Sequence, residues 1–127
     1  MSSVFALATP ATKSALCVFR VSGFGCLDVF GSIFNKKLNE PRKFYQRSLV
    51  SDGVVIDKVG VVFFRGPSSY TGEDSFEIYA HGGLAVMASI VDLFKSVGFD
   101  EAGPGEFTKR AFINGKLSLS CLLYTSP

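Results

Sequence analysis

The sequence predicts an α+β domain with a mixed, largely antiparallel sheet and two to three helices. Three observations lead to this fold class: short apolar segments rich in β-branched and aromatic residues, an Asp-Gly turn between two of them, and two longer segments with helical spacing. In chain order the elements are strands, a helix, a hairpin, a strand and two helices, without internal repeats.

The first two strands and the first helix are predicted before residue 35. Residues 4–8 are a short apolar segment, and residues 14–22 are a stronger strand candidate that ends at Gly23. In residues 25–34 apolar side chains recur at helical spacing. Residues 36–42 are polar and contain a proline, so we expect a loop there.

A β-hairpin is predicted next. Asp52-Gly53 separates two strand candidates, residues 44–51 and 54–65, and Asp-Gly is a strong signal for a two-residue hairpin turn. Residues 75–80 follow a Gly-Pro-Ser-Ser turn and are predicted to form a further strand.

Two helices complete the prediction. Residues 84–97 carry apolar side chains on nearly every side, which favours a helix buried on more than one face, with Gly98 as its C′ residue. Such a helix supports self-association, although it could also lie between sheet and loops of one subunit. Residues 106–113 are a shorter helix candidate, ended by Asn114-Gly115.

Composition limits the class of protein. A chain of 127 residues fits one domain, and its apolar content of 47% is far from that of a disordered protein. The formal net charge of +2 gives no overall signature of a dedicated nucleic-acid binder, although it is compatible with a small basic patch.

Cysteine usage and hydropathy predict the compartment. Cys17, Cys26 and Cys121 share no metal-ligand spacing, which indicates reduced thiols, and Cys17 is predicted to be a small core residue. No apolar run approaches the ~20 residues of a membrane span, and the amino terminus lacks a basic signal region. We therefore expect a cytoplasmic protein without a membrane contact.

Arg20 and Glu77 are the first candidate site residues. Strand alternation places Arg20 on one face with Leu16 and Val18, where an unpaired guanidinium would be costly. Arg20 should therefore lie at the rim of the sheet or meet an anion, either a side chain or a ligand. Glu77 shares a face with Tyr79 and is either solvated or directed into a pocket, where it could pair with an aminopyrimidine edge.

The candidates near the end of the chain are basic. Arg110 and Lys116 could meet a ligand carboxylate or phosphate, or could simply be solvated, while Phe107 and Phe112 are predicted to be buried anchors. His81 precedes Gly82-Gly83, and a lone histidine there usually has a structural role. The chain contains neither a G-x-x-x-x-G-K-[ST] phosphate loop nor a G-x-G-x-x-G fingerprint.

Five segments, taken in order and spacing, carry a specific resemblance. They are residues 6–10 (ALATP), 19–23 (FRVSG), 66–74 (GPSSYTGED), 77–83 (EIYAHGG) and 104–117 (PGEFTKRAFINGKL). Together they resemble the N-terminal domain of the MnmE (TrmE) family of tRNA modification GTPases, over residues 4–119. We expect this domain to span residues 1–120. Residues 121–127 resemble a translated sequencing adapter and are expected to be a non-native tail.

The resemblance implies a fold similar to the folate-binding part of aminomethyltransferases and a homodimer that holds formyl-tetrahydrofolate. The family's folate-contacting positions fall on Arg20, Glu77 and Lys116, and all three residue types match. On this basis Glu77 is expected to pair with the aminopyrimidine edge of the pterin, whereas Arg20 and Lys116 meet acceptor or carboxylate groups. No catalytic residue and no metal site are expected in this chain.

For full-length members the resemblance also implies GTP hydrolysis with magnesium and potassium. Together with the partner protein MnmG, they place a carboxymethylaminomethyl-type group on the wobble uridine of tRNA. The GTP-binding loops and the C-terminal cysteine of the family have no counterpart here, so enzymatic activity of this chain stays open. Two alternatives are a folate-dependent module of the aminomethyltransferase type and a purely structural dimerisation domain.

Overall fold

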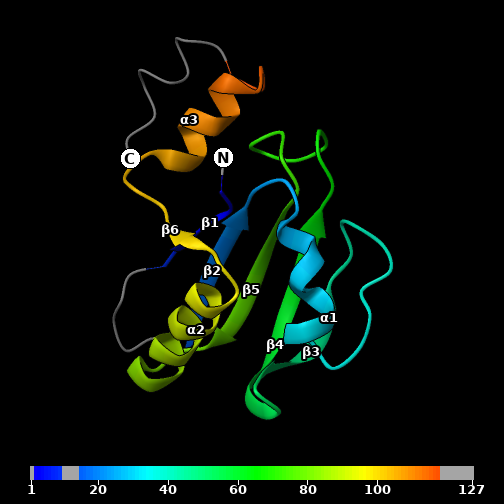
Figure 1. Ribbon diagram of the computed structural model, residues 1–127, viewed down its shortest axis with the longest axis vertical. Helices are drawn as coiled ribbons and strands as arrows, with labels where there is room; N and C mark the ends of the chain where they lie inside the picture. Colours follow the sequence, from blue (N-terminus) through cyan, green and yellow to red (C-terminus); the bar gives the residue numbers. More distant parts are fainter. Residues whose placement is uncertain (1, 10–14, 118–127) are drawn as a thin grey trace.

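The computed structural model describes residues 2–9 and 15–117 and confirms the α+β fold class (Figure 1). The elements in chain order are β1 (Val4–Leu7), β2 (Leu16–Ser22), the 3-10 turn η1 (Cys26–Val29), α1 (Phe30–Ile33), β3 (Tyr45–Ser51), β4 (Val54–Phe64), β5 (Ser75–His81), α2 (Leu84–Ser96), β6 (Asp100–Glu101) and α3 (Glu106–Ile113). The expected tail at residues 121–127 lies outside the described residues.

One sheet organises the domain. Its strand order is β3-β4-β5-β2-β1-β6, and all pairs are antiparallel except the short β1–β6 pair, which is parallel. The predicted mixed, largely antiparallel sheet is therefore confirmed. Within it β2 pairs with β5, so two strands more than fifty residues apart in sequence lie side by side at its centre.

The predicted hairpin is confirmed as the pair β3–β4. Asp52 and Gly53 both adopt positive φ angles, 49° and 78°, as a type I′ turn requires at its two central residues. The register shifts next to this turn, between Leu49 and Val50, where β4 carries one extra residue, Ile56, as in a β-bulge. The hairpin therefore forms the twisted outer edge of the sheet.

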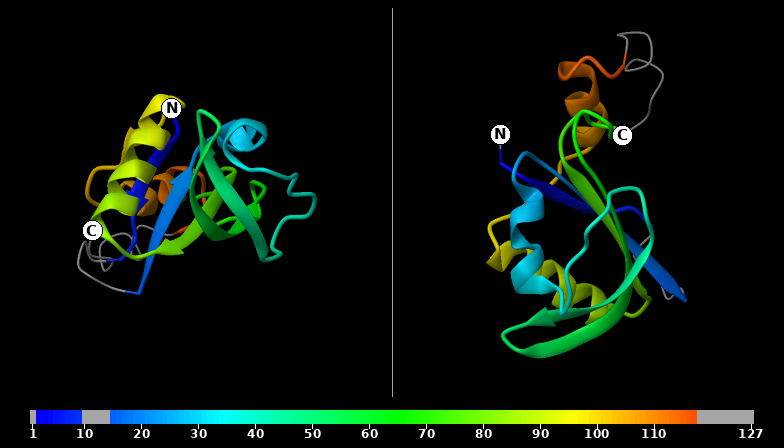
Figure 2. Two further views of the ribbon diagram at one scale, coloured as in Figure 1. Left: turned by 90° about the horizontal axis from the view of Figure 1, so that it is seen from below. Right: turned by 90° about the vertical axis from the view of Figure 1, so that its right-hand side faces the viewer.

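Helices α1 and α2 cover one face of the sheet, as the right-hand view of Figure 2 shows. Between them and the sheet lies a core dominated by phenylalanine. Phe19, Phe63, Phe76 and Phe94 are each at most 1% exposed, and the ring of Phe94 contacts those of Phe19 and Phe76 edge to face. The inward-facing phenylalanines of the strands and α2 therefore form the centre of the core, and the sequence contains no tryptophan.

Helix α2 is amphipathic within one chain, contrary to the expectation that it would be buried on more than one face. Met87, Ile90, Leu93 and Phe94 are buried, but the opposite face is exposed. Alanines on the exposed face made the sequence look apolar on nearly every side, although their small side chains do not need to be buried. The predicted C′ residue Gly98 is confirmed by its φ of 94°.

Cys17 and Cys26 are free thiols in the core, which confirms the core prediction for Cys17. Burial raises the pKa of both, and for Cys26 burial and the charges of Asp74 and Glu73 raise the pKa to about 12. Both cysteines therefore pack as small hydrophobic residues.

The opposite face of the sheet is not covered by any helix of residues 2–9 and 15–117. Helix α3 stands beyond the ends of the central strands, next to the loop that joins β4 to β5 (Figures 1 and 2). No helix in the described part of the chain is long and apolar enough to cross a membrane. The open sheet face and α3 together frame the candidate site.

Candidate functional site

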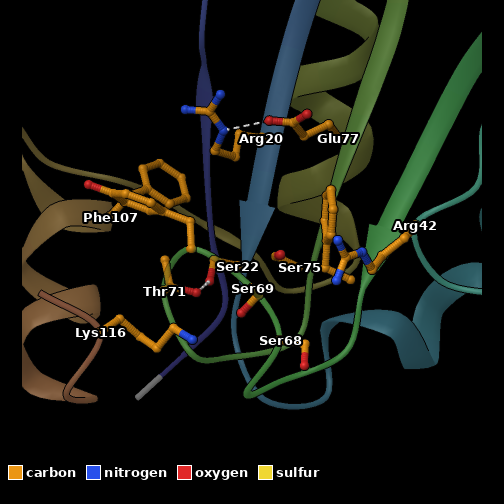
Figure 3. A pocket seen from close by; sticks show the side chains of 12 residues that line it. Arg20, Ser22, Arg42, Ser68, Ser69, Thr71, Ser75, Glu77, Phe107 and Lys116 are labelled. Atoms are coloured by element: carbon orange, nitrogen blue, oxygen red, sulfur yellow. Dashed lines mark hydrogen bonds and ion pairs between the residues drawn. The ribbon is translucent and has the colours of Figure 1, made fainter.

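A cavity of about 710 Å³ opens where the uncovered sheet face meets the β4–β5 loop and α3. Its size is in the range of small-molecule sites. Arg20 and Glu77 line it from the sheet, Phe107 and Lys116 from α3 and the segment that follows, and Arg42 from the loop before β3 (Figure 3). The structure therefore brings all three predicted site residues to one cavity.

Arg20 and Glu77 are directly opposite each other in the β2–β5 register. Nε of Arg20 donates to Oε2 of Glu77 at 2.8 Å, and the two side chains are 45% and 21% exposed. The predicted strand alternation is confirmed, because the neighbouring Phe19 and Phe76 point into the core. The terminal nitrogens of Arg20 have no hydrogen-bond partner among the described residues and remain open to a ligand.

Tyr79 is a hydrogen-bond partner of the Glu77 carboxylate. Its hydroxyl donates to Oε1 of Glu77 at 2.6 Å. Burial, the hydrogen bond to Glu77 and the charge of Glu77 together raise the pKa of Tyr79 to about 12, while the charge of Arg20 acts in the opposite direction. The phenol therefore stays neutral and fixes the orientation of Glu77.

Lys116 approaches the cavity from the opposite side. Its Nζ donates to the carbonyl of Pro67 at 3.0 Å, which ties it to the β4–β5 loop. Asn114 makes a second tie, because its side-chain amide donates to the carbonyl of Thr71 at 2.8 Å. These bonds hold the segment after α3 against the loop and present the ammonium group to the cavity (Figure 3).

Arg42 is a cavity residue that the sequence reasoning missed. It has a left-handed backbone conformation with φ 62°, and its backbone N–H donates to the carbonyl of Phe63 at 2.8 Å. In Figure 3 its side chain enters from the side opposite Phe107 and Lys116. No motif marked it, because it lies in a polar loop among other basic residues.

The lining carries more positive than negative charge. Arg20, Arg42 and Lys116 face the cavity, and Glu77 is the one carboxylate among its lining residues. Since Glu77 is already paired with Arg20, the net field favours an anionic ligand. Apolar walls come from Phe64 and Phe107.

Arg110 is not a ligand-binding residue, and it is not solvated either; both readings of the sequence were wrong. Its side chain is 3% exposed and donates to Glu106 at 2.9 Å and to Glu73 at 3.1 Å. Burial tends to lower the pKa of Arg110, but the hydrogen bonds and charges of Glu106 and Glu73 outweigh this and raise it. Arg110 therefore has a structural role.

Glu73 is the partner that the sequence reasoning did not single out. It is fully buried, and Oγ of Ser22 donates to its carboxylate at 2.8 Å while also contacting the hydroxyl of Thr71 at 2.7 Å. The loop is thereby joined to β2 and α3 beneath the cavity floor. Little in the sequence indicates this role, because Glu73 lies in a turn-forming segment, where a carboxylate is usually expected to be exposed to solvent.

The other predicted residues have smaller roles. Phe107 lines the cavity, but Phe112 is 36% exposed and is not the buried anchor that was predicted. His81 is paired with Asp57, with Nδ1 to Oδ1 at 2.9 Å, in agreement with a structural role. The described residues contain no group of three or more His, Cys, Asp or Glu side chains that could hold a metal ion.

Fold and site together define a small α+β domain with a cavity that carries excess positive charge. The family model described as the N-terminus of the GTP-binding protein TrmE matches residues 3–116, and the chain belongs to this family.

Similar relatives are named tRNA modification GTPase MnmE. The protein from Pseudothermotoga lettingae is 44% identical over 93% of this chain, that from Gluconacetobacter diazotrophicus 41% over 91%, and that from Helicobacter pylori 38% over 93%. The chain covers 26–28% of the length of these three relatives.

Proposed function

We propose that this chain is the folate-binding and dimerising N-terminal part of a tRNA modification GTPase that acts on the wobble uridine. In this proposal the cavity holds formyl-tetrahydrofolate. The observation that carries it is the convergence of Arg20, Glu77 and Lys116, from two central strands and the segment after α3, on one cavity.

Glu77 keeps the capacity to bind a pterin. A carboxylate has about four lone-pair sites, and Arg20 and Tyr79 use one on each oxygen. One site on each oxygen is left for an amino group and a ring N–H, which is the bidentate geometry of an aminopyrimidine edge. Arg20 and Tyr79 orient the carboxylate for this contact.

The cations on the other sides of the cavity suit the acidic end of a folate. Lys116 and Arg42 can each meet a carboxylate of the glutamate tail, and the terminal nitrogens of Arg20 can meet an acceptor oxygen on the ring system. Phe64 and Phe107 provide apolar walls for the flat rings. Bound formyl-tetrahydrofolate would supply the one-carbon unit, while the residues named here bind and orient it.

The remaining activity of the longer protein is part of the same proposal. The relatives are about three and a half times as long as this chain. In the proposal, the rest of such a protein binds GTP, magnesium and potassium and acts with MnmG on tRNA. This domain then contributes the folate and one half of a homodimer in the cytoplasm.

Calorimetric titration with formyl-tetrahydrofolate tests the folate site. Glu77→Gln is expected to weaken binding by tenfold or more, because hydrogen bonds to a charged group contribute about 1.5–3 kcal/mol. Glu101→Gln is the matched control, since Glu101 is 60% exposed and pairs with Lys95 on another part of the molecule. If Glu77→Gln stayed within twofold of the unchanged chain, the role of Glu77 would be wrong.

Sedimentation of the unchanged chain tests the dimer separately. A dimer is expected at micromolar concentrations. A strictly monomeric chain that still binds folate would contradict the proposed dimer but would leave the proposed folate site in place. A dimer that gives no heat with formyl-tetrahydrofolate would instead identify a structural dimerisation domain.

A further inference from the structure

A second cavity, of about 680 Å³, lies on the same open sheet face towards the β3 edge. Its lining includes Lys36, Lys58, Phe44, Tyr79 and His81 and contains no Asp or Glu. The folate proposal uses none of these residues as ligand contacts. The cavity therefore needs an explanation of its own.

Two aromatic rings form a fixed platform in this cavity. Phe44 is 57% exposed although it packs against the backbone of Gly60, where a side chain would collide with its ring. The ring centroid of Phe44 is 6.1 Å from that of Tyr79, with 40° between the planes. A large ring held in place and yet exposed is a surface on which a flat partner can stack.

The cations around the platform are available to a ligand. Lys36 and Lys58 are exposed, and their ammonium groups have no partner among residues 2–9 and 15–117. Arg47, by contrast, donates from both terminal nitrogens to the carbonyls of Gln46 and Lys37. The two lysines, with His81 beside them, are therefore the groups that can meet an anion.

The segment of chain that supplies the two lysines is basic as a whole. Residues 36–65 contain seven basic and three acidic residues, a net charge of +4, whereas the whole chain carries +2. Asp57, one of the three acids, is paired with His81. The loop before β3 and the β3–β4 hairpin thus form a positive region in an otherwise slightly acidic chain.

We propose that this face binds single-stranded RNA, with bases stacked on Phe44 and Tyr79 and phosphates at Lys36 and Lys58. Unpaired bases stack on exposed aromatic rings, and nearby cations hold the backbone without reading sequence. A second copy of this chain fits less well, because two faces of the same positive charge would repel. The choice of RNA as the partner and the location of its site are both independent of the folate proposal.

The position of the platform gives the proposal a further consequence. Tyr79 and Glu77 are neighbours on the same face of β5, joined by the hydroxyl-to-carboxylate bond of 2.6 Å. An RNA base on the platform would therefore lie next to the first cavity. The open face would hold an RNA and a small anionic ligand side by side.

Fluorescence anisotropy with a labelled uridine-rich RNA of about ten nucleotides tests the cations, since single-strand sites commonly span roughly 4–16 nucleotides. The double variant Lys36→Ala/Lys58→Ala is compared with Lys95→Ala/Lys109→Ala, which removes the same charge from two exposed lysines on α2 and α3. The first variant is expected to lower affinity at least tenfold at low salt. Its slope of log affinity against log salt should shrink by about 1.4, because two single-strand phosphate contacts are lost.

Phe44→Leu tests the stacking surface. It is expected to lower affinity about tenfold with an unchanged salt slope, since base stacking is independent of counterion release. Should this variant fold poorly, an NMR titration of the unchanged chain replaces it: RNA is expected to shift the amide signals of Phe44, Lys58 and Gly60 most strongly.

Several outcomes would overturn the proposal. Equal weakening by the two lysine pairs would show only a general charge effect. Duplex RNA or polyglutamate that competes as well as the single strand would assign the face to another anion, and a dimer that Phe44→Leu dissociates would assign it to a second copy. Folate titration of Lys36→Ala/Lys58→Ala is expected to be unchanged, so the two proposals can fail independently.

Discussion

Among the described residues, the pair Arg20–Glu77 and the pair Arg110–Glu73 differ mainly in their burial. Arg20 and Glu77 are 45% and 21% exposed on the open sheet face, whereas Arg110 and Glu73 are 3% and 0% exposed beneath the β4–β5 loop. An exposed pair contributes little to stability and can exchange partners with a ligand. A buried pair must stay complete, because either charge alone would lack compensation.

The two pairs are linked through Ser22. This residue lies two positions after Arg20 on β2, and its hydroxyl donates to the carboxylate of Glu73. The buried pair thereby sets the position of α3 and of the loop, and so of Lys116 at the cavity. Burial therefore separates the two pairs: the buried pair belongs to the framework of the cavity, and the exposed pair is the one that the proposed ligand would meet.

The largest effect is expected from Glu73→Gln. This change leaves the guanidinium of Arg110 buried with one carboxylate fewer, and removing one partner of a buried pair costs about 3–5 kcal/mol. Urea unfolding of the variant and of the unchanged chain measures the loss. Glu101→Gln, at an exposed pair, is the control, and a cost below about 1 kcal/mol for Glu73→Gln would contradict the structural role.

Asn114→Ala should have an intermediate effect. It removes the hydrogen bond from Asn114 to the carbonyl of Thr71 and is expected to cost about 1 kcal/mol. The urea midpoint should fall with an unchanged m-value, because the surface exposed on unfolding stays the same. Asn39→Ala is the matched control, since Asn39 is exposed and its side chain makes no hydrogen bond within the described residues. Equal effects of the two changes would show that the tie between α3 and the loop is unimportant.

A small effect on stability is expected at the exposed pair. A double-mutant cycle of Arg20→Gln and Glu77→Gln should give a coupling free energy of about 0.2–1 kcal/mol that decreases with added salt. A coupling free energy of this size, measured by urea unfolding, would distinguish the exposed pair from the buried pair. A coupling above about 3 kcal/mol would show that Arg20 and Glu77 also belong to the structural framework.

Much of the fold was predictable because it depends on local patterns. The Asp52-Gly53 turn, the alternation in β2 and β5, and the Gly98 end of α2 each follow from residues within a few positions of one another. The strand order was not predictable in this way. The pairing of β2 with β5 joins segments far apart in sequence, and no local signal specifies it.

The candidate site was predictable only in part, for the same reason. Arg20, Glu77 and Lys116 were found through their motif blocks, and the structure places them at one cavity. The roles of Arg110 and Glu73 depend on desolvation by a distant loop, which a local pattern does not report. Arg42 reaches the cavity because its loop returns to the end of β4, again a tertiary effect.

The smallest expected effect concerns the phenol beneath Glu77. The pKa of Tyr79 is raised to about 12 in the fold, above its ordinary value near 10, so its contribution to stability is present below pH ~10 and is lost as the pH rises through 12. Phenolate absorbance of the unchanged chain should show a last step near pH 12 that Tyr79→Phe removes and Tyr70→Phe retains. In Glu77→Gln this step should move only part of the way down, because burial, the main cause, persists while the neighbouring charge is lost. A step that returned fully to the ordinary value would show instead that the charge of Glu77 sets it, and that the open pair is more strongly coupled to its surroundings than its exposure indicates.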